Sequence, residues 1–436
     1  MPRRAIAPLD IGTVLRHASS AMTETSAPSA DLGCDVAIVG GGLVGLSLAL
    51  ALAGAGLAVV VVDRETPAVS AADAADGRSS AIAWGSQRVL AALGIWDGLG
   101  AHAAAIDDIR VSDGTSRLFL HYDHADVADH PLGFIVENRH TRRALQAAAA
   151  TRPRLRWLAP MGVAAIENLP AARHLLLADG TRIAARLVVG CDGKRSFVRD
   201  AAGISAFTHR YGQSGIVANL RHALPHANVA HERFLPAGPF AMLPLPDADG
   251  AHRSSIVWTE RAAIVPRLMA LDDAGFAAEA QRRFGPWLGA LSPEGRRFAY
   301  PLEIVHADSY VAPRLALAGD AAHAIHPIAG QGFNLGLRDV AALAECIVDA
   351  ARLGLDIGAP DVLARYAGWR RVDTMSLLAV TDALNRLFSN DIPPLRLARD
   401  IGLAAVDRVA PLKRLLMRHA MGVVGDLPRL VRGEPL

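Results

Sequence analysis

The chain of 436 residues is poor in cysteine and lysine, and it has no apolar run long enough to span a membrane. Its three cysteines, Cys34, Cys191 and Cys346, lie far apart and form no CxxC or other metal-binding spacing, which indicates buried thiols in a reducing compartment. Lysine occurs only at Lys194 and Lys413, whereas arginine and alanine are abundant, as in proteins of GC-rich bacterial genomes. A formal net charge of +2 gives no reason to expect nucleic acid as a partner.

Length and composition limit the size of the core and the number of domains. With 51% hydrophobic residues, the chain can bury a large core, and its length favours two domains over one. Residues 1–30 are rich in Arg, Ser and Ala, have few acids and show no continuing periodicity. A transit peptide has a similar composition, but we interpret the segment as a disordered leader, with Met22 as a natural start. It lacks the apolar region of a secretory signal.

An apolar strand followed by spaced glycines begins the ordered part. Residues 35–40 are apolar and β-branched, as expected of a strand buried on both faces. Gly40, Gly42 and Gly45 then form G-x-G-x-x-G at a strand-to-helix turn. The first permits the tight turn, the second lets the backbone approach a pyrophosphate, and the third lets the helix pack closely on the strand. The helix predicted from about Val44 to Gly54 points its positive N-terminus at the phosphates.

A second predicted strand, residues 58–63, ends in an acid. Asp63 falls near the spacing of about 20 residues expected for a ribose-binding carboxylate. The alternative for the glycines alone is a turn with no ligand, and the strand, helix and acid in this order count against it. The motif does not separate FAD from NAD. Its position before any catalytic domain favours FAD.

A second motif follows the apolar strand predicted over 186–190. Asp192 and Gly193 come after Cys191, and Ser196 and Arg199 open the next predicted helix. Taken alone, this pattern is most simply an Asp-Gly turn with a serine cap.

A third motif joins a strand, an acid and a glycine-rich helix start. The apolar strand at 315–319 ends in Gly319-Asp320, and ligands of α/β sheets bind at such carboxyl ends. The turn into the helix predicted over 331–351 contains Pro327, Gly330, Gln331, Gly332 and Asn334. The two glycines let the backbone approach a flat ring, and the helix N-terminus would stabilise the anionic edge of a reduced flavin. The alternative is an ordinary glycine-rich helix cap.

His323 and His326 flank this motif at a spacing that could suggest a metal pair. No carboxylate or cysteine stands at ligand spacing, so we expect structural packing or packing beside a flavin, and no metal.

The three motifs in this order resemble the FAD-dependent aromatic hydroxylases, the class A flavoprotein monooxygenases, and the resemblance runs from about residue 33 to the C-terminus. It implies an α/β fold: a Rossmann-like FAD-binding domain of the GR2 type, like that of p-hydroxybenzoate hydroxylase, with an inserted sheet-rich substrate domain and a helical C-terminal part. It also implies non-covalent FAD, with NAD(P)H and O₂ as co-substrates. There is no second G-x-G-x-x-G, which agrees with transient binding of the nicotinamide.

The resemblance assigns roles to individual residues. Asp320 would bind the ribityl hydroxyls, and Asp192 the pyrophosphate. The residues expected to bind FAD are Gly40, Gly42, Gly45, Asp63, Arg64, Arg78, Arg139, Asp192, Gly193, Gly319, Asp320, Gly332 and Asn334. Those expected around the reacting flavin ring and its hydroperoxide are Pro327, Gly330, Gln331 and Gly332. Asp63 departs from the many relatives that carry glutamate there, but the shorter acid still reaches a ribose.

Further segments resemble the ubiquinone-biosynthesis hydroxylases of the UbiH/UbiF/VisC type. They are residues 76–83, 93–96, 133–138, 233–244, 257–259 and 381–390, with Ser86 and Met421-Gly422. The implied reaction is hydroxylation of the ring of a polyprenylated phenol through a C4a-hydroperoxyflavin, as in a 2-polyprenyl-6-methoxyphenol hydroxylase. The protein must hold the ring, exclude water and position the flavin. The ring carbon, prenyl length, choice of NADH or NADPH and oligomeric state stay open.

The predicted elements divide the chain into consecutive regions. After the leader, residues 31–210 form the first part of the FAD-binding domain. Residues 211–300 form the substrate domain, with strands at 213–222, 229–236, 240–246 and 253–260 and a helix near 272–284. The chain returns to the FAD-binding domain over 301–360, and 361–436 are mostly helical.

Two other functions remain open. One is an FAD-dependent reductase of the geranylgeranyl reductase type, and the other is a flavin-binding scaffold of a ubiquinone-synthesis complex, against which the intact turn at 330–334 argues.

From Pro411 to Leu436, five cations and two acids give +3, and leucines interleave with the cations at helical spacing. This pattern fits a helix at a membrane surface, and it fits a helix packed on the body equally well.

We expect a cytoplasmic protein, with peripheral attachment to the inner membrane as the alternative.

Overall fold

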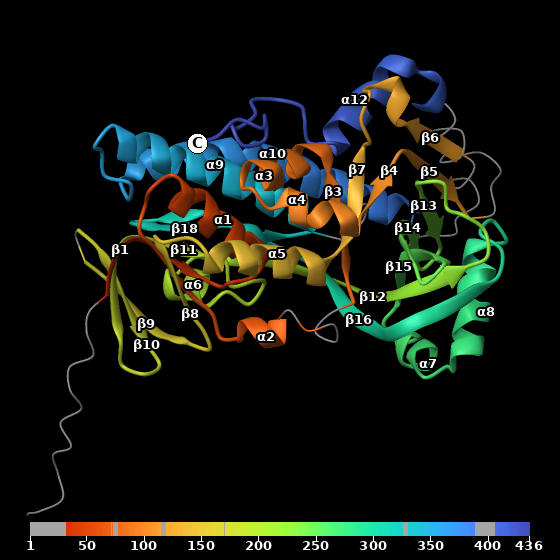
Figure 1. Ribbon diagram of the computed structural model, residues 1–436, viewed down its shortest axis with the longest axis horizontal. Coiled ribbons are helices and arrows are strands. Elements are labelled where there is room, and N and C mark those ends of the chain that lie inside the picture. Colours follow the sequence, from red (N-terminus) through yellow and green to blue (C-terminus); the bar gives the residue numbers. More distant parts are fainter. Residues whose placement is uncertain are drawn as a thin grey trace, which may run out of the picture.

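The structure is a computed structural model, and it describes residues 32–70, 72, 77–114, 119–169, 171–325, 330–388 and 406–436. The predicted leader, Asp76, His326 and Pro327 lie outside these ranges. Figure 1 shows two bodies side by side, one built on a largely parallel sheet and the other on a long antiparallel sheet. In the described residues, no helix is both long and apolar enough to cross a bilayer.

The first body is built on a sheet with strand order β17-β18-β11-β1-β2-β8. Its strands are β1 (Leu32–Val39), β2 (Val59–Val62), β8 (Leu155–Leu158), β11 (Arg182–Gly190), β17 (Val311–Ala312) and β18 (Leu315–Leu317). β1 pairs in parallel with β2 and β11, and β18 pairs in parallel with β11. β10 (Arg173–Leu177) and β9 (Val163–Asn168) extend from β11 as an antiparallel hairpin. The late strand returns to this sheet beside β11, as predicted, and the parallel pairing places the carboxyl ends of β1, β11 and β18 at one edge.

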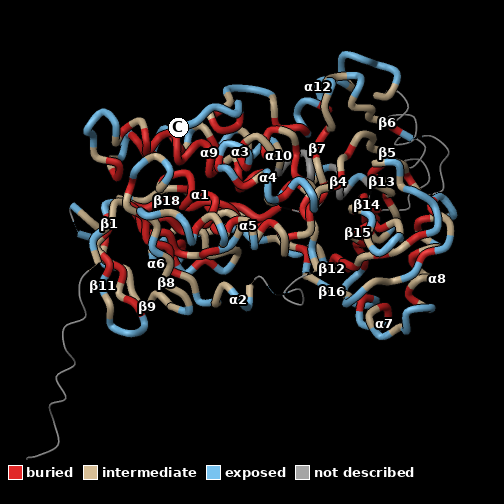
Figure 2. The backbone as a smooth tube through the Cα atoms, in the orientation of Figure 1, coloured by how far each residue is buried: buried red, intermediate tan, exposed pale blue. Residues whose placement is uncertain are grey.

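Helices cover this sheet because its apolar strands must be buried on both faces. α1 (Leu43–Gly54) packs between α5 (Asn138–Ala150) and α9 (Gly332–Arg352), and α10 (Pro360–Phe388) packs on α9. α1 is apolar on nearly every side and correspondingly buried (Figure 2). The short helices are α2 (Pro67–Ser70), α3 (Trp84–Ala92), α4 (Trp96–Leu99), α6 (Phe197–Ala201), η1 (Gly100–His102), η2 (His124–Asp126) and η3 (Gly319–Ala321).

The second body is a sheet with strand order β19-β16-β12-β15-β14-β13-β5-β6. Its strands are β5 (Asp108–Asp113), β6 (Phe119–Asp123), β12 (Ala206–His222), β13 (Val229–Leu235), β14 (Gly238–Ala248), β15 (Ala251–Arg261), β16 (Leu291–Ala307) and β19 (His323–Ala324). The four predicted strands are therefore present. β16 was missed because Pro293, Gly295 and Pro301 interrupt its strand pattern. The boundaries at 211 and 300 remain a proposal, since β12 and β16 cross them and β5 and β6 come earlier in the chain.

The two faces of the second sheet have different coverings. α7 (Val265–Met269) and α8 (Asp273–Phe284) cover the outer face through a core that includes Trp258 and Phe276. The inner face meets a small sheet of the first body, β3 (Ser79–Ala83), β7 (Gly133–Glu137) and β4 (Ala103–Ile106). α12 (Ala410–Ala420) closes this contact with Met417. The inner face therefore looks toward the first body.

A buried carboxylate holds the late motif in place. Asp339, on the second turn of α9, is fully buried and accepts hydrogen bonds from the Gly319 N–H at 2.9 Å and from Arg370 Nε at 2.7 Å. His323 Nε2 lies 2.7 Å from the same carboxylate. Burial alone would raise the pKa of Asp339, but His323 and Arg370 outweigh it and hold the pKa below its usual value. The charged form therefore stays buried and fixes β18, α9 and α10 to one another.

We predict that Asp339→Asn destabilises the fold by about 3–5 kcal/mol, because it removes the charge that balances a buried guanidinium. The measurement is the free energy of unfolding in denaturant. Glu279→Gln on α8 is the control: Glu279 pairs with Arg282 and Arg283 at the surface, so its loss should cost less than about 1 kcal/mol. Equal losses in the two variants would contradict the central role of Asp339.

Candidate functional site

The first glycine turn has the geometry of a ligand cradle. Gly40 has φ +104°, and a Cβ there would lie 2.4 Å from the Cys191 carbonyl oxygen. A Cβ on Gly45 would lie 1.9 Å from the Gly40 oxygen, so both positions require glycine for packing. A Cβ on Gly42 would meet nothing within 4 Å. The second glycine therefore faces open space, where a pyrophosphate would approach the backbone.

Asp63 clamps this turn to the end of β2. Its Oδ2 accepts a hydrogen bond from the Gly41 N–H at 2.5 Å, and its Oδ1 accepts one from the Glu65 N–H at 2.9 Å. The neighbouring Arg64 is exposed and lines a surface hollow with Met161 and Gly162. The sequence predicted the acid at this strand end but not its bond to the glycine turn. Its ribose contact stays a prediction.

Two helices begin at this sheet edge without a side-chain cap. α1 follows Gly42 and α9 follows Gln331, and in neither case does a side chain accept a hydrogen bond from the first turn. Uncapped N–H groups and the helix dipole favour an anionic ligand. The Val44 side chain fits between Gly319 and Gly336, which brings the first turn of α1 against the start of α9. The arrangement fits a ligand with a pyrophosphate and an electron-rich ring.

Asp320 has an exposed carboxylate. It lies in η3 directly after Gly319, whose φ is +62°. Its side chain is exposed and makes no hydrogen bond with the described residues. A carboxylate at the carboxyl end of a parallel strand is well placed for the hydroxyls of a bound ligand.

The Asp-Gly motif forms the helix cap that the sequence indicated. Asp192 accepts hydrogen bonds from Ser196 Oγ at 2.5 Å and from the Val198 N–H at 3.1 Å, and Ser196 caps α6 by accepting from the Arg199 N–H. Burial raises the pKa of Asp192 despite these bonds. Arg199 donates to the Ala321 carbonyl at 3.1 Å, which ties the cap to η3. A pyrophosphate contact of Asp192 or Gly193 stays a prediction.

The helix start at 330–334 has one open and two packed positions. Gly330 has φ +62°, and a Cβ there would lie 2.9 Å from the Ala81 Cβ, whereas a Cβ on Gly332 would meet nothing within 4 Å. Asn334 is fully buried, accepts from the Ala83 N–H at 2.9 Å and donates to the Ala81 carbonyl at 2.7 Å. It also donates to Gln331 Oε1 at 3.3 Å. These hydrogen bonds hold α9 on β3. A cofactor contact of Asn334 stays a prediction.

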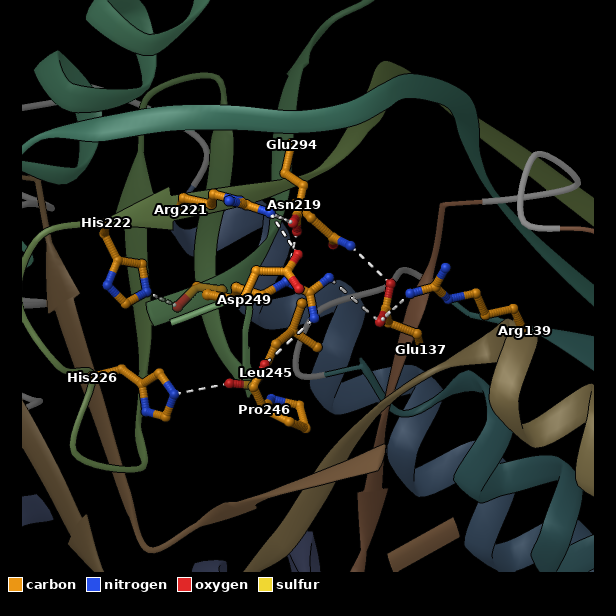
Figure 3. Close-up of polar contacts among 12 residues, drawn as sticks. Glu137, Arg139, Asn219, Arg221, His222, His226, Leu245, Pro246, Asp249 and Glu294 are labelled. Carbon is orange, nitrogen blue, oxygen red and sulfur yellow. Dashed lines mark hydrogen bonds and ion pairs between the residues drawn. The ribbon is translucent and has the colours of Figure 1, made fainter. Parts of the chain in front are cut away.

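A charged network that the sequence did not reveal joins the two bodies (Figure 3). Glu137, at the end of β7, accepts from Asn219 Nδ2 at 2.8 Å and from Arg139 at 3.0 Å, and it lies 3.6 Å from Arg253. Arg253 in turn donates to Glu294 at 2.6 Å. Burial by itself would raise the pKa of Glu137, but His140, Arg139 and Arg253 lower it to about 2. No motif signals this network, because its members come from β7, β12, β15 and β16.

Two of the three predicted arginines, Arg78 and Arg139, lie where the bodies meet. Arg139 is engaged with Glu137, and the Arg78 guanidinium lies 5.0 Å from the centre of the Tyr300 ring. Phe298 packs so close to Gly77 that a Cβ on Gly77 would lie 2.4 Å from its ring. The residues just before β3 therefore contact the sheet of the second body. Cofactor contacts of Arg78 and Arg139 stay predictions.

The cysteines have no chemical role that the geometry supports. All three are free, and burial raises the pKa of Cys34 to about 12, that of Cys346 to about 11 and that of Cys191 well above its usual value. Thiols with such pKa values stay protonated and unreactive. In the part of the chain that the structure describes, no three His, Cys, Asp or Glu residues form a group that could hold a metal ion.

Residues 33–368 match the family described as FAD binding domain. The chain is 53% identical to ubiquinone hydroxylase UbiL of Rhodospirillum rubrum, over 94% of this chain and 95% of that protein. It is 37% identical to 3-demethoxyubiquinol 3-hydroxylase of Escherichia coli, over 89% and 98% of the two chains. The chain belongs to the family of FAD-dependent ubiquinone hydroxylases. The predicted enzyme class, an FAD-dependent monooxygenase with NAD(P)H and O₂ as co-substrates, is confirmed.

The fold is shared with solved flavoprotein structures. p-Nitrophenol 4-monooxygenase PnpA of Pseudomonas putida superposes with a TM-score of 0.74 over 88% of this chain and 97% of that one, at 22% sequence identity. At this identity the match concerns the fold alone. The predicted fold class is confirmed.

We predict that Asp63→Ala and Asp320→Ala each weaken FAD binding, because a lost charge-assisted hydrogen bond costs about 1.5–3 kcal/mol, or roughly ten- to a hundredfold in affinity. Flavin occupancy after dialysis measures the effect, with FAD identified after release by heat. Glu167→Ala, at an exposed carboxylate on β9, is the control. Occupancy equal to wild type in both aspartate variants would mean that these acids do not hold the cofactor.

Proposed function

We propose that the protein hydroxylates the aromatic ring of a polyprenylated phenol in ubiquinone biosynthesis, as a 2-polyprenyl-6-methoxyphenol hydroxylase does. The observation that carries the proposal is the 53% identity to a ubiquinone hydroxylase over almost the entire chain. When bound, FAD uses NAD(P)H and O₂ to supply the oxygen atom that enters the ring. The residues of the chain have to hold the phenol, orient it toward the flavin and keep water out.

The inner face of the second sheet supports this assignment. Val217, Val257 and Ala241 lie side by side across β12, β15 and β14, with Phe298 next to them on β16. A wall of small apolar side chains leaves room for an aromatic ring and excludes water from it. This wall faces the first body, which carries the helix start at Gly330–Gly332. The phenol would lie between the two.

The two alternative functions predict different products. A reductase of the geranylgeranyl reductase type would saturate double bonds of the prenyl chain without O₂, and a scaffold would leave the phenol unchanged. Both UbiL and the Escherichia coli relative are hydroxylases by name, which favours the hydroxylase.

We predict that the purified protein with FAD, NADPH and 2-geranylphenol forms a product heavier by one oxygen atom, and that this oxygen derives from O₂. Incubation under ¹⁸O₂, read by mass spectrometry, tests both points. Expression in strains that each lack one ring hydroxylase then identifies the ring carbon, because only the matching strain regains ubiquinone. A product heavier by two hydrogen atoms would support the reductase instead. Unchanged phenol, with NADPH oxidised to NADP⁺ and O₂ reduced only to hydrogen peroxide, would contradict the hydroxylase.

α12 provides a surface by which such an enzyme could reach its substrate. Met417 is buried and Met421, just after the helix, packs beside it, whereas Leu412, Leu415 and Leu416 are 41%, 54% and 40% exposed. Exposed cations accompany these leucines at Arg414 and Arg418. The helix thus packs on the body through Met417, with Met421 beside it, and leaves these three leucines exposed. An exposed apolar stripe beside cations matches an anionic lipid surface.

We therefore propose that α12 docks a cytoplasmic enzyme onto the inner membrane, where a polyprenyl phenol resides. Delivery by a partner in a ubiquinone-synthesis complex is the alternative, in which lipid binding is not needed.

The triple variant Leu412→Ser, Leu415→Ser, Leu416→Ser should lose binding to phosphatidylglycerol vesicles by more than about tenfold, because each buried leucine contributes about 1.5–3 kcal/mol. Co-sedimentation measures binding to the vesicles, and the melting temperature checks that the variant is folded. The control is Leu353→Ser with Leu355→Ser, which removes leucines that are 74% and 50% exposed after α9. Unchanged sedimentation of the triple variant would exclude α12 as the docking surface.

A further inference from the structure

One carboxylate on the inner face of the substrate sheet has no partner. Glu232 lies on β13, opposite Ala241 of β14 and Val111 of β5. Its neighbours point the other way, since the His231 ring packs at 5.2 Å from Phe284 of α8 and Arg233 donates to the Phe284 carbonyl. Side chains alternate along a strand, so Glu232 faces the first body.

Glu232 stands at the end of the apolar wall described above. Ala241 is its direct neighbour, followed by Val257, Val217 and Phe298 on successive strands. The adjacent inner-face residues Ala230 and Leu243 pack in one cluster with Ala81, the residue that contacts Gly330. Glu232 is therefore on the face of the sheet that is turned toward the first body, the body that carries the helix start at 330–334.

The surroundings of Glu232 are apolar. It makes no hydrogen bond or ion pair with any described residue, and part of its surface remains accessible. Burial raises its pKa to about 7, with no contribution from a charged neighbour. Other charged or titratable groups on this face, or packed against it, include Asp113 on β5, Tyr122 on β6, Arg253 on β15, Glu294 on β16 and Glu137 at the end of β7. An unpaired carboxylate in such a place destabilises a fold, which points to a ligand that pairs with it.

Two hydroxyls on the same face also lack partners. Ser255 and Thr259 flank Val257 on β15, are 0% and 1% exposed, and make no hydrogen bond with the described residues. A few polar groups on an apolar wall are the usual composition of a site that orients a ring with one hydroxyl.

We propose that Glu232 is a catalytic residue that binds the phenol hydroxyl of the substrate and accepts its proton. The inference rests on the proposed function. The phenol O–H bond breaks, a carboxyl O–H bond forms, and the electron pair stays on the phenol oxygen, which enriches the ring carbons that take up the oxygen atom. When the ring carbon then releases its proton to solvent and aromaticity returns, Glu232 gives its proton back to the oxygen from which it came. A base with a pKa near the working pH suits this transfer.

Glu232→Gln is the direct test, with 2-geranylphenol as the substrate. We expect kcat for hydroxylation to fall by about a hundredfold or more, while NADPH oxidation continues and yields hydrogen peroxide. In wild type, kcat should rise with pH through about 7, and the variant should lack this limb.

Glu260→Gln is the matched control. Glu260 is 7% exposed on β15 of the same sheet, but it faces α8 and pairs with Arg283 at 3.3 Å. The substitution makes the same chemical change on the opposite face, so it should lower the melting temperature and leave the pH profile and product yield unchanged.

Stability gives a second, substrate-free readout. Because the folded-state pKa is raised from 4.5 to about 7, the folded protein holds the proton more tightly, and stability is lost as pH rises between these values. Wild type and Glu232→Gln should melt together at pH 4.5, and the variant should melt higher at pH 8. A variant that melts below wild type at pH 8 would show a structural partner and overturn the inference.

The outcomes separate the two proposals. If wild type makes no hydroxylated phenol, the proposed function fails and the role of Glu232 with it. If wild type hydroxylates and Glu232→Gln keeps kcat and the pH profile within about twofold, the function stands and the inference about Glu232 is wrong.

Discussion

The buried carboxylate of Asp339 is the constraint on which the rest of the site depends. It binds the backbone of Gly319, the guanidinium of Arg370 and the ring of His323, and so joins the end of β18, α10 and β19 through one residue of α9. A buried charge is tolerated only when it is fully paired, so these elements have one common arrangement. That arrangement leaves Asp320 at the surface of the sheet edge and turns the uncapped start of α9 toward the same space.

The second constraint is the distance between the two bodies. The Glu137 network bonds the end of β7 to β12 and β15 with a carboxylate whose low pKa keeps it charged at neutral pH. The polar contacts of this network and the apolar cluster that includes Leu245 and Met421 hold the second sheet at a fixed distance from the first body. Rigid spacing matters for a monooxygenase, because its activated oxygen is wasted when water enters or the ring is misplaced.

Local signals made the sequence informative for one body and less so for the other. The strand, glycine turn and acid at 35–63 follow one another along the chain, so their geometry could be predicted, and the same holds for Gly319-Asp320 and α9. β16 could not, because its prolines pair at irregularities that only the neighbouring strands reveal. The pairing of β5 with β13 could not be predicted either, and the same holds for the Glu137 and Asp339 networks, because their partners lie far apart in the sequence. The hydrogen bonds of the Asn334 amide to β3 could not be predicted for the same reason.

Hydrogen-bond satisfaction separates the residues that build the site from those that serve a ligand. Asp192, Asn334 and Asp339 have their polar atoms occupied by the protein, and removing them would expose unpaired backbone. Asp320, Glu232, Ser255 and Thr259 make no such bonds with the described residues, although three of the four lie in apolar or buried surroundings. Folding gains nothing from polar groups left in this state, and a protein keeps them where a bound molecule completes their bonds. Asp320 follows the carboxyl end of β18 and the other three lie on the inner face of the second sheet, so the groups without a partner among the described residues fall in two separate places.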